Sequence, residues 1–110
     1  MFKIMNIFTQ QLYTIQSKDI TSVVIVLADE NHPIFKAHFE GNPLLPAFLH
    51  VDIAAEIFGF EVVGISRSKF MAPLLPNDEV VVSIEQRPAG VRVRFVRDTR
   101  IASEINLEIL

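Results

Sequence analysis

The spacing of apolar residues along this 110-residue chain changes from a strand pattern to a helical pattern and back. Residues 20–28 form a β-branched, nearly continuous apolar run, which predicts a buried strand. A weaker alternation over residues 12–16 predicts a strand before it. The later stretches that alternate or are rich in β-branched residues predict four more strands, at residues 61–66, 79–86, 91–96 and 101–110.

Between these strands, residues 47–58 predict a helix that is apolar on nearly every side. Pro46 suits the first turn of this helix, and Gly59 suits its C-terminal end. Residues 29–46 hold three of the six prolines and one of the four glycines, so we predict irregular structure there. The pattern favours an α+β fold in which a curved antiparallel sheet wraps around one central buried helix.

Length and composition predict one folded domain over residues 1–110. Half of the residues are apolar, nine are phenylalanine and the mean hydropathy is positive. A chain of this size leaves apolar surface uncovered, which favours an oligomer or a site for an apolar ligand. A small sheet also has edge strands that need pairing, so we expect a homodimer, with higher oligomers of dimers left open.

Several function classes are disfavoured by charge and residue usage. The net charge of −3 argues against nucleic-acid binding. The absence of cysteine excludes a disulfide framework and a thiol nucleophile. The sequence predicts no membrane span, and the first eight residues do not resemble a signal peptide, so we expect a cytoplasmic protein.

Candidate chemistry centres on a histidine and an aspartate. His38 lies at the start of a loop rich in glycine and proline, and Asp52 lies on the apolar helix. Polar groups on buried apolar elements are costly unless they are paired or used. Such a pair suits general acid–base chemistry on an apolar substrate.

Two segments resemble a known enzyme family. Residues 31–46, N-H-P-I-F-K-A-H-F-E-G-N-P-L-L-P, are similar to the active-site loop N-x-P-F-F-x-G-H-F-P-G-x-P-x-x-P-G of hot-dog-fold 3-hydroxyacyl-[acyl-carrier-protein] dehydratases. The acidic residue of that family lies fourteen positions after the histidine, where this chain has Asp52, as in the family's Asp-type members. Residues 69–78, K-F-M-A-P-L-L-P-N-D, resemble the family's R-F-x-x-P-V-x-P-G-D, and the resemblance covers about residues 20–110.

This resemblance implies dehydration of 3-hydroxyacyl thioesters to trans-2-enoyl thioesters, with His38 as base and Asp52 as acid. The acid role needs a protonated carboxyl, which the apolar neighbours of Asp52 favour. The resemblance also implies that the two residues meet across a dimer interface and that no cofactor or metal takes part. The substrate would be carried by acyl carrier protein or coenzyme A. The candidate substrate-binding residues are Phe39, Gly41, Leu44, Leu45, Pro46, Ala47, Phe48 and Phe70.

The chain departs from the family pattern at several positions. The departures include Ala37 for Gly, Glu40 for Pro, Ala47 for Gly, Glu56 for Gln and Asn77 for Gly. Ala47 would be strained in any conformation that needs a positive φ, whereas Asn77 tolerates the left-handed region. A backbone N–H near Ala47 is expected to polarise the thioester oxygen. Glu56, one turn after Asp52, is expected to be a structural hydrogen-bonding residue.

Other interpretations remain open. The fold also suits an acyl thioesterase, or a module that binds acyl chains or acyl carrier protein without turnover. His32 and His50 are expected to be bystanders, because the spacings of His32, His38, His50 and Asp52 match no zinc pattern. Five arginines lie in or beside the predicted strands at 79–86 and 91–96: Arg87, Arg92, Arg94, Arg97 and Arg100. They fit either a solvated sheet face or, together with Lys36, a docking patch for an acidic carrier protein.

Overall fold

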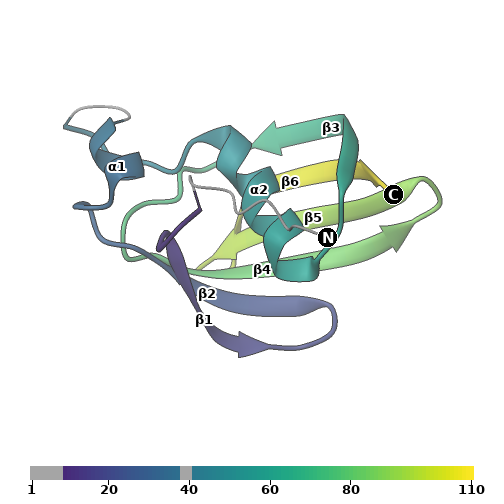
Figure 1. The fold of residues 1–110 in the computed structure, drawn as a ribbon, viewed down its shortest axis with the longest axis horizontal. Helices are drawn as coiled ribbons and strands as arrows, with labels where there is room; N and C mark the ends of the chain where they lie inside the picture. Colours follow the sequence, from purple (N-terminus) through teal and green to yellow (C-terminus); the bar gives the residue numbers. More distant parts are fainter. Residues whose placement is uncertain (1–8, 38–40) are drawn as a thin grey trace.

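The computed structural model describes residues 9–37 and 41–110. Its elements are, in chain order, β1 (Tyr13–Lys18), β2 (Ser22–Leu27), α1 (Pro33–Ala37), α2 (Ala47–Phe58), β3 (Val62–Phe70), β4 (Glu79–Arg87), β5 (Gly90–Arg97) and β6 (Arg100–Ile109). All strand pairings are antiparallel, and they join the strands in the order β1-β2-β4-β5-β6-β3. The sheet curves around α2, as the sequence predicts (Figure 1).

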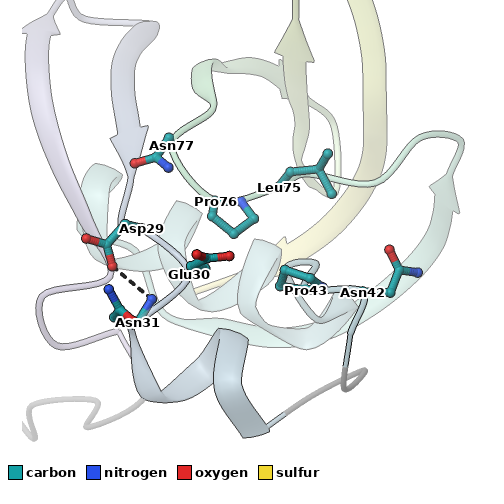
Figure 2. Close-up of a pocket in the computed structure, with 8 residues that line it drawn as sticks. All are labelled: Asp29, Glu30, Asn31, Asn42, Pro43, Leu75, Pro76 and Asn77. Carbon is teal, nitrogen blue, oxygen red and sulfur yellow. Dashed lines mark hydrogen bonds between the residues drawn. The ribbon is translucent and has the colours of Figure 1, made fainter.

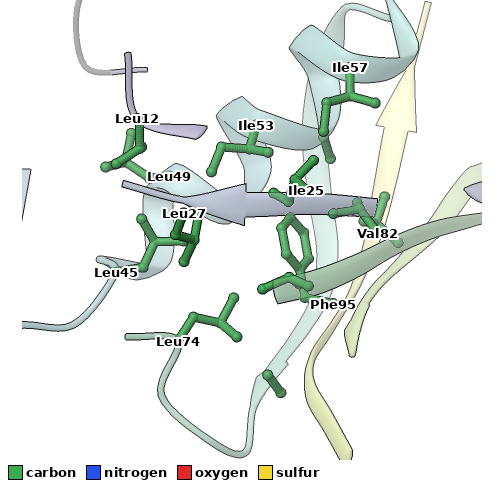
Figure 3. Close-up of a cluster of buried hydrophobic side chains, with 14 of the residues drawn as sticks. Leu12, Ile25, Leu27, Leu45, Leu49, Ile53, Ile57, Leu74, Val82 and Phe95 are labelled. Carbon is green, nitrogen blue, oxygen red and sulfur yellow. The ribbon is translucent and has the colours of Figure 1, made fainter. Parts of the chain in front are cut away.

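The core lies between α2 and the sheet. On the helix, the i, i+4 series Leu49, Ile53 and Ile57 is buried, which gives α2 an apolar face toward the strands. On β2, buried and half-buried residues alternate, so every second side chain reaches the core. Figure 3 shows Ile53 and Ile57 gathered with Ile25 and Phe95 in this cluster.

The bounds of α2 agree with the prediction because its ends carry strong local signals. Pro46 stands just before the first helical residue, with φ −58°. Gly59 ends the helix with φ +72° and donates its N–H to the carbonyl oxygen of Ala55 at 2.9 Å. A left-handed residue after the last helical turn is a common way to end a helix, and glycine adopts it without steric cost.

The structure differs from the sequence prediction in two segments. Pro33 begins the short helix α1, where irregular structure is predicted; the backbone N–H of Ile34 donates to Nδ1 of His32 at 3.1 Å. Strand β3 runs on to Phe70, four residues beyond the predicted end at residue 66. Its second half is exposed on both sides, so it lacks the apolar alternation that marks a strand with one buried face.

Candidate active site

The predicted catalytic loop is only partly within the described structure. His38 and Phe39 lie outside the described residues, so their positions remain predictions. The description resumes at Gly41, whose φ of +76° favours glycine. From there the chain runs through Pro43 and Pro46 directly into α2. The loop therefore leads into the helix that carries Asp52.

The junction between this loop and α2 is held by backbone hydrogen bonds. Leu45 donates its N–H to the carbonyl oxygen of Leu74 at 2.8 Å, which ties the junction to the loop between β3 and β4. The side chain of Leu45 is 2% exposed and lies in the core cluster with Leu74 (Figure 3). Pro46 is buried beside it, and Leu44 is half-buried.

The helix begins without backbone strain at the position where the family has glycine. Ala47 is the first residue of α2 and is exposed. It is not among the described non-glycine residues with positive φ, which are Gln11, Asn77, Asp98 and Thr99. Asn77, by contrast, has φ +67°, as expected for a residue that replaces a turn glycine. In the first turn of α2, the N–H of Leu49 donates to the carbonyl oxygen of Pro46 at 3.1 Å. The N-terminal end of a helix carries a partial positive charge, which suits it to polarising an oxygen.

Asp52 and Glu56 occupy successive turns of α2 and have different surroundings. Asp52 is half-buried. Glu56 accepts hydrogen bonds from Oγ1 of Thr9 at 2.6 Å and from the hydroxyl of Tyr13 at 2.5 Å. Burial, together with the bond to Glu56, raises the pKa of Tyr13 above its usual value. The prediction that Glu56 is a structural hydrogen-bonding residue is confirmed.

His50 is enclosed by the fold. Its side chain is 2% exposed, and its Nδ1 lies 2.8 Å from Oγ of Ser103 on β6. Its ring centroid lies 4.8 Å from that of Phe95 and 5.1 Å from that of Phe70, the latter in an edge-on arrangement. Burial lowers the pKa of His50 to about 4, although a backbone hydrogen bond with Leu45 opposes this shift. The imidazole is therefore neutral at pH 7.

Two predicted substrate-binding phenylalanines lie on the surface of the single chain. Phe48, in the first turn of α2, is 48% exposed, and Phe70, at the end of β3, is 45% exposed. Exposed apolar residues Val63, Ile65 and Met71 lie on or just after the same strand. Because large apolar side chains gather along an edge strand, this side of the molecule has the character of an interface.

A cleft of about 560 Å³ opens beside the catalytic loop (Figure 2). It is lined by Asp29, Glu30, Asn31, Asn42, Pro43, Leu75, Pro76 and Asn77. None of the predicted site residues that the structure describes is among these, although Asn42 directly follows Gly41. Within residues 9–37 and 41–110, no three histidine or acidic side chains are grouped closely enough to hold a metal ion.

The arginines of β5 are largely engaged in ion pairs. Arg94 donates from Nε to Glu104 at 2.7 Å, and this bond holds the pKa of Glu104 below its usual value. Arg92 bonds Glu85 on β4 at 3.3 Å, and Arg97 bonds Asp78 at 3.1 Å. These contacts favour the interpretation of a solvated, internally paired sheet face.

The sequence does not predict which residues form hydrogen bonds with Glu56 and His50 on α2. An acid and a histidine on an apolar helix signal that hydrogen-bonding partners are needed. The hydroxyl groups that form these hydrogen bonds belong to residues 43 to 53 positions away in the chain. They are Thr9 and Tyr13 for Glu56, and Ser103 for His50. Only the folded arrangement identifies them.

Comparison with known proteins identifies the family. A family model described as ApeI-like, for the ApeI dehydratase, matches residues 14–105. The chain belongs to the ApeI-like dehydratase family. Its curated relatives include the 3-hydroxyacyl-[acyl-carrier-protein] dehydratase FabZ of Polynucleobacter necessarius, which is 27% identical over 70% of this chain and 64% of the relative. The bifunctional enzyme LpxC/FabZ of Chlorobaculum tepidum is 30% identical over 47% of this chain and 14% of that protein. The chain thus spans less than two thirds of the length of these relatives.

Solved structures show the fold of this ApeI-like chain. The dehydratase heterocomplex ApeI:P from Xenorhabdus doucetiae matches with a TM-score of 0.68 and 23% identity, over 87% of this chain and 93% of that one. Mouse thioesterase superfamily member 2 matches with a TM-score of 0.58 and 15% identity, over 90% and 82% of the two chains. These likenesses confirm the predicted hot-dog fold. In the described part of the chain, no helix has the length and apolar character needed to cross a membrane.

Proposed function

We propose that this protein dehydrates 3-hydroxyacyl thioesters to trans-2-enoyl thioesters in fatty-acid or related lipid synthesis. The observation that carries the proposal is the family match over residues 14–105, which spans both His38 and Asp52. Asp52 lies fourteen positions after His38 and on the helix into which the loop leads. A curated relative is named as a 3-hydroxyacyl-[acyl-carrier-protein] dehydratase, which favours acyl carrier protein over coenzyme A as the carrier.

The proposed chemistry needs one base, one acid and one polarising donor. As a neutral imidazole, His38 removes the proton from C2 of the acyl chain. Asp52 gives a proton to the C3 hydroxyl, which leaves as water while the C2–C3 double bond forms. A backbone N–H at the start of α2, near Ala47, stabilises the negative charge that develops on the thioester oxygen.

The proposed active unit is a homodimer. Phe48, Phe70 and Ile65 are exposed in the single chain, and β3 stands at one end of the order of strands formed by residues 9–37 and 41–110. Pairing of β3 with β3 of a second copy would cover these residues and form the walls of an acyl-binding tunnel. In this arrangement His38 of one protomer meets Asp52 of the other.

The proposal is tested with crotonyl thioester as substrate, by following the loss of enoyl absorbance as water adds. His38→Ala and Asp52→Asn are each expected to lower the rate by about 10²–10⁴-fold, the usual contribution of a general acid or base. Asp98→Asn is the matched control, because Asp98 is exposed in the turn between β5 and β6 with φ +49°, a conformation that asparagine tolerates.

The same assay separates the other interpretations. Free thiol released without hydroxyacyl product would replace the dehydratase proposal with a thioesterase. The absence of turnover, together with intact binding of acyl carrier protein, would identify a binding module. A rate that does not change in His38→Ala and Asp52→Asn would remove these residues from the mechanism.

A further inference from the structure

A buried polar pair, His50 and Ser103, links α2 to β6. His50 on the helix and Ser103 on β6 are 2% and 0% exposed, and their side chains lie within hydrogen-bonding distance at 2.8 Å. An apolar residue of similar size at each position would fill the same space without the cost of burying polar groups. Their pairing therefore fixes one arrangement of helix and strand where apolar packing alone permits small shifts.

The pair lies next to the groups that the proposed reaction uses. His50 is two residues before Asp52 on α2, so a displacement of its backbone moves the catalytic carboxyl. Its ring packs against the ring of Phe70, which lines the proposed acyl-binding surface on β3. Phe95 of β5 contacts the ring as well, so the imidazole bridges α2 to three strands.

The same residue reaches the loop that carries the predicted base. The backbone of Leu45 forms a hydrogen bond with His50, while the N–H of Leu45 donates to Leu74 at 2.8 Å. Leu45 is therefore held from the helix and from the loop between β3 and β4. Replacement of His50 by an apolar residue would release one of these two restraints.

We propose that His50 is a positioning residue, which uses its bond to Ser103 and its contact with Phe70 to fix Asp52 and the start of α2 relative to the acyl chain. This role rests on the proposed dehydratase function. It is distinct from catalysis, because His50 is enclosed by protein and acts through Asp52 and Phe70.

The test compares His50→Leu, Ser103→Ala and the double variant with the wild type in crotonyl-thioester hydration. Each single variant leaves one buried polar side chain without its partner, so both should melt at a lower temperature than the wild type. The double variant removes both polar groups and should recover most of the melting temperature. Because Leu45 and Phe70 still lack their contacts with the imidazole, its kcat should remain about tenfold below that of the wild type.

A further variant, His50→Gln, tests whether another hydrogen-bonding side chain at this position can restore kcat. Glutamine supplies a donor and an acceptor, so it should recover part of the kcat that His50→Leu loses. Thr14→Ala is the control, since Thr14 is exposed on β1 at the far edge of the sheet from β3.

The outcomes distinguish failure of the positioning role of His50 from failure of the proposed dehydratase function. A double variant that regains the wild-type kcat together with its melting temperature would overturn the positioning role and leave the dehydratase proposal intact. Equal kcat in His50→Gln and His50→Leu would also overturn it. A wild-type protein that does not turn over would overturn the proposed function, and the positioning role with it.

Discussion

At the residue scale, the polar side chains of α2 divide into two kinds. His50 and Glu56 each have hydrogen-bonding partners on distant parts of the chain, which offset the cost of placing polar groups on an apolar helix. Asp52 lies between them and is half-buried. The partners of His50 and Glu56 support a structural role for these two residues, whereas proton transfer by Asp52 stays a prediction.

The burial of His50 predicts a specific loss of stability in acid. Its pKa is about 4 in the folded protein and near 6.5 in the unfolded chain. Between these values the unfolded chain binds a proton that the folded protein does not, so stability falls as the pH drops from 6.5 toward 4. The full difference corresponds to a loss of about 3 kcal/mol in the free energy of unfolding.

Urea unfolding measured at several pH values from 7 to 4 checks this prediction. His50→Gln removes the titrating group, so the stability of that variant should fall less steeply over the same interval. Thr14→Ala is the control, because it changes an exposed residue that does not titrate and should retain the wild-type slope. A His50→Gln protein with the wild-type pH dependence would show that other groups cause the loss.

At the scale of elements, the two edge strands of the sheet differ in what they expose. Strand β3 exposes Val63, Ile65 and, at its end, Phe70, and Phe48 is exposed in the first turn of α2. Strand β1, at the opposite edge, exposes Ile15 among polar residues. Of the two edges in the described sheet, the β3 edge therefore combines exposed apolar residues with Phe70, a proposed substrate-binding residue.

Substituting glutamate for an exposed isoleucine on each edge strand tests which strand forms the proposed dimer interface. Ile65→Glu should dissociate the dimer and lower the hydration rate at least tenfold, because burying an unpaired carboxylate in an interface costs several kcal/mol. Ile15→Glu replaces a similarly exposed isoleucine, 47% against 54%, and should leave both assembly and rate unchanged. Sedimentation and the enoyl assay are measured on the same samples; dissociation by Ile15→Glu alone would place the interface at β1.

The elements also show what a sequence pattern can and cannot predict. Strand β2 and helix α2 are predictable because burial on defined faces imposes a period, and because Pro46 and Gly59 mark the ends of the helix. The second half of β3 escapes prediction because both its sides are exposed. The motif predicts the site residues, whereas the partners of His50 and Glu56 depend on contacts between segments far apart in the chain.

At the scale of the whole molecule, this member of the ApeI-like dehydratase family has a hot-dog sheet in which β3 is the last of the described strands at one end. Ala47 is the first residue of α2 and does not have a positive φ, so alanine in place of the family's glycine does not strain the start of this helix. We expect an assembled pair of chains to complete the acyl-binding site that a single chain leaves exposed.

The most direct test of the central claim is the approach to equilibrium from both sides. The wild-type protein is supplied in separate reactions with crotonyl and 3-hydroxybutyryl thioesters of acyl carrier protein, and the acyl species and free thiol are quantified. The account predicts that both reactions converge on one mixture of enoyl and hydroxyacyl thioesters, that no thiol is released, and that His38→Ala does not catalyse the interconversion. Release of free thiol without interconversion would contradict the account.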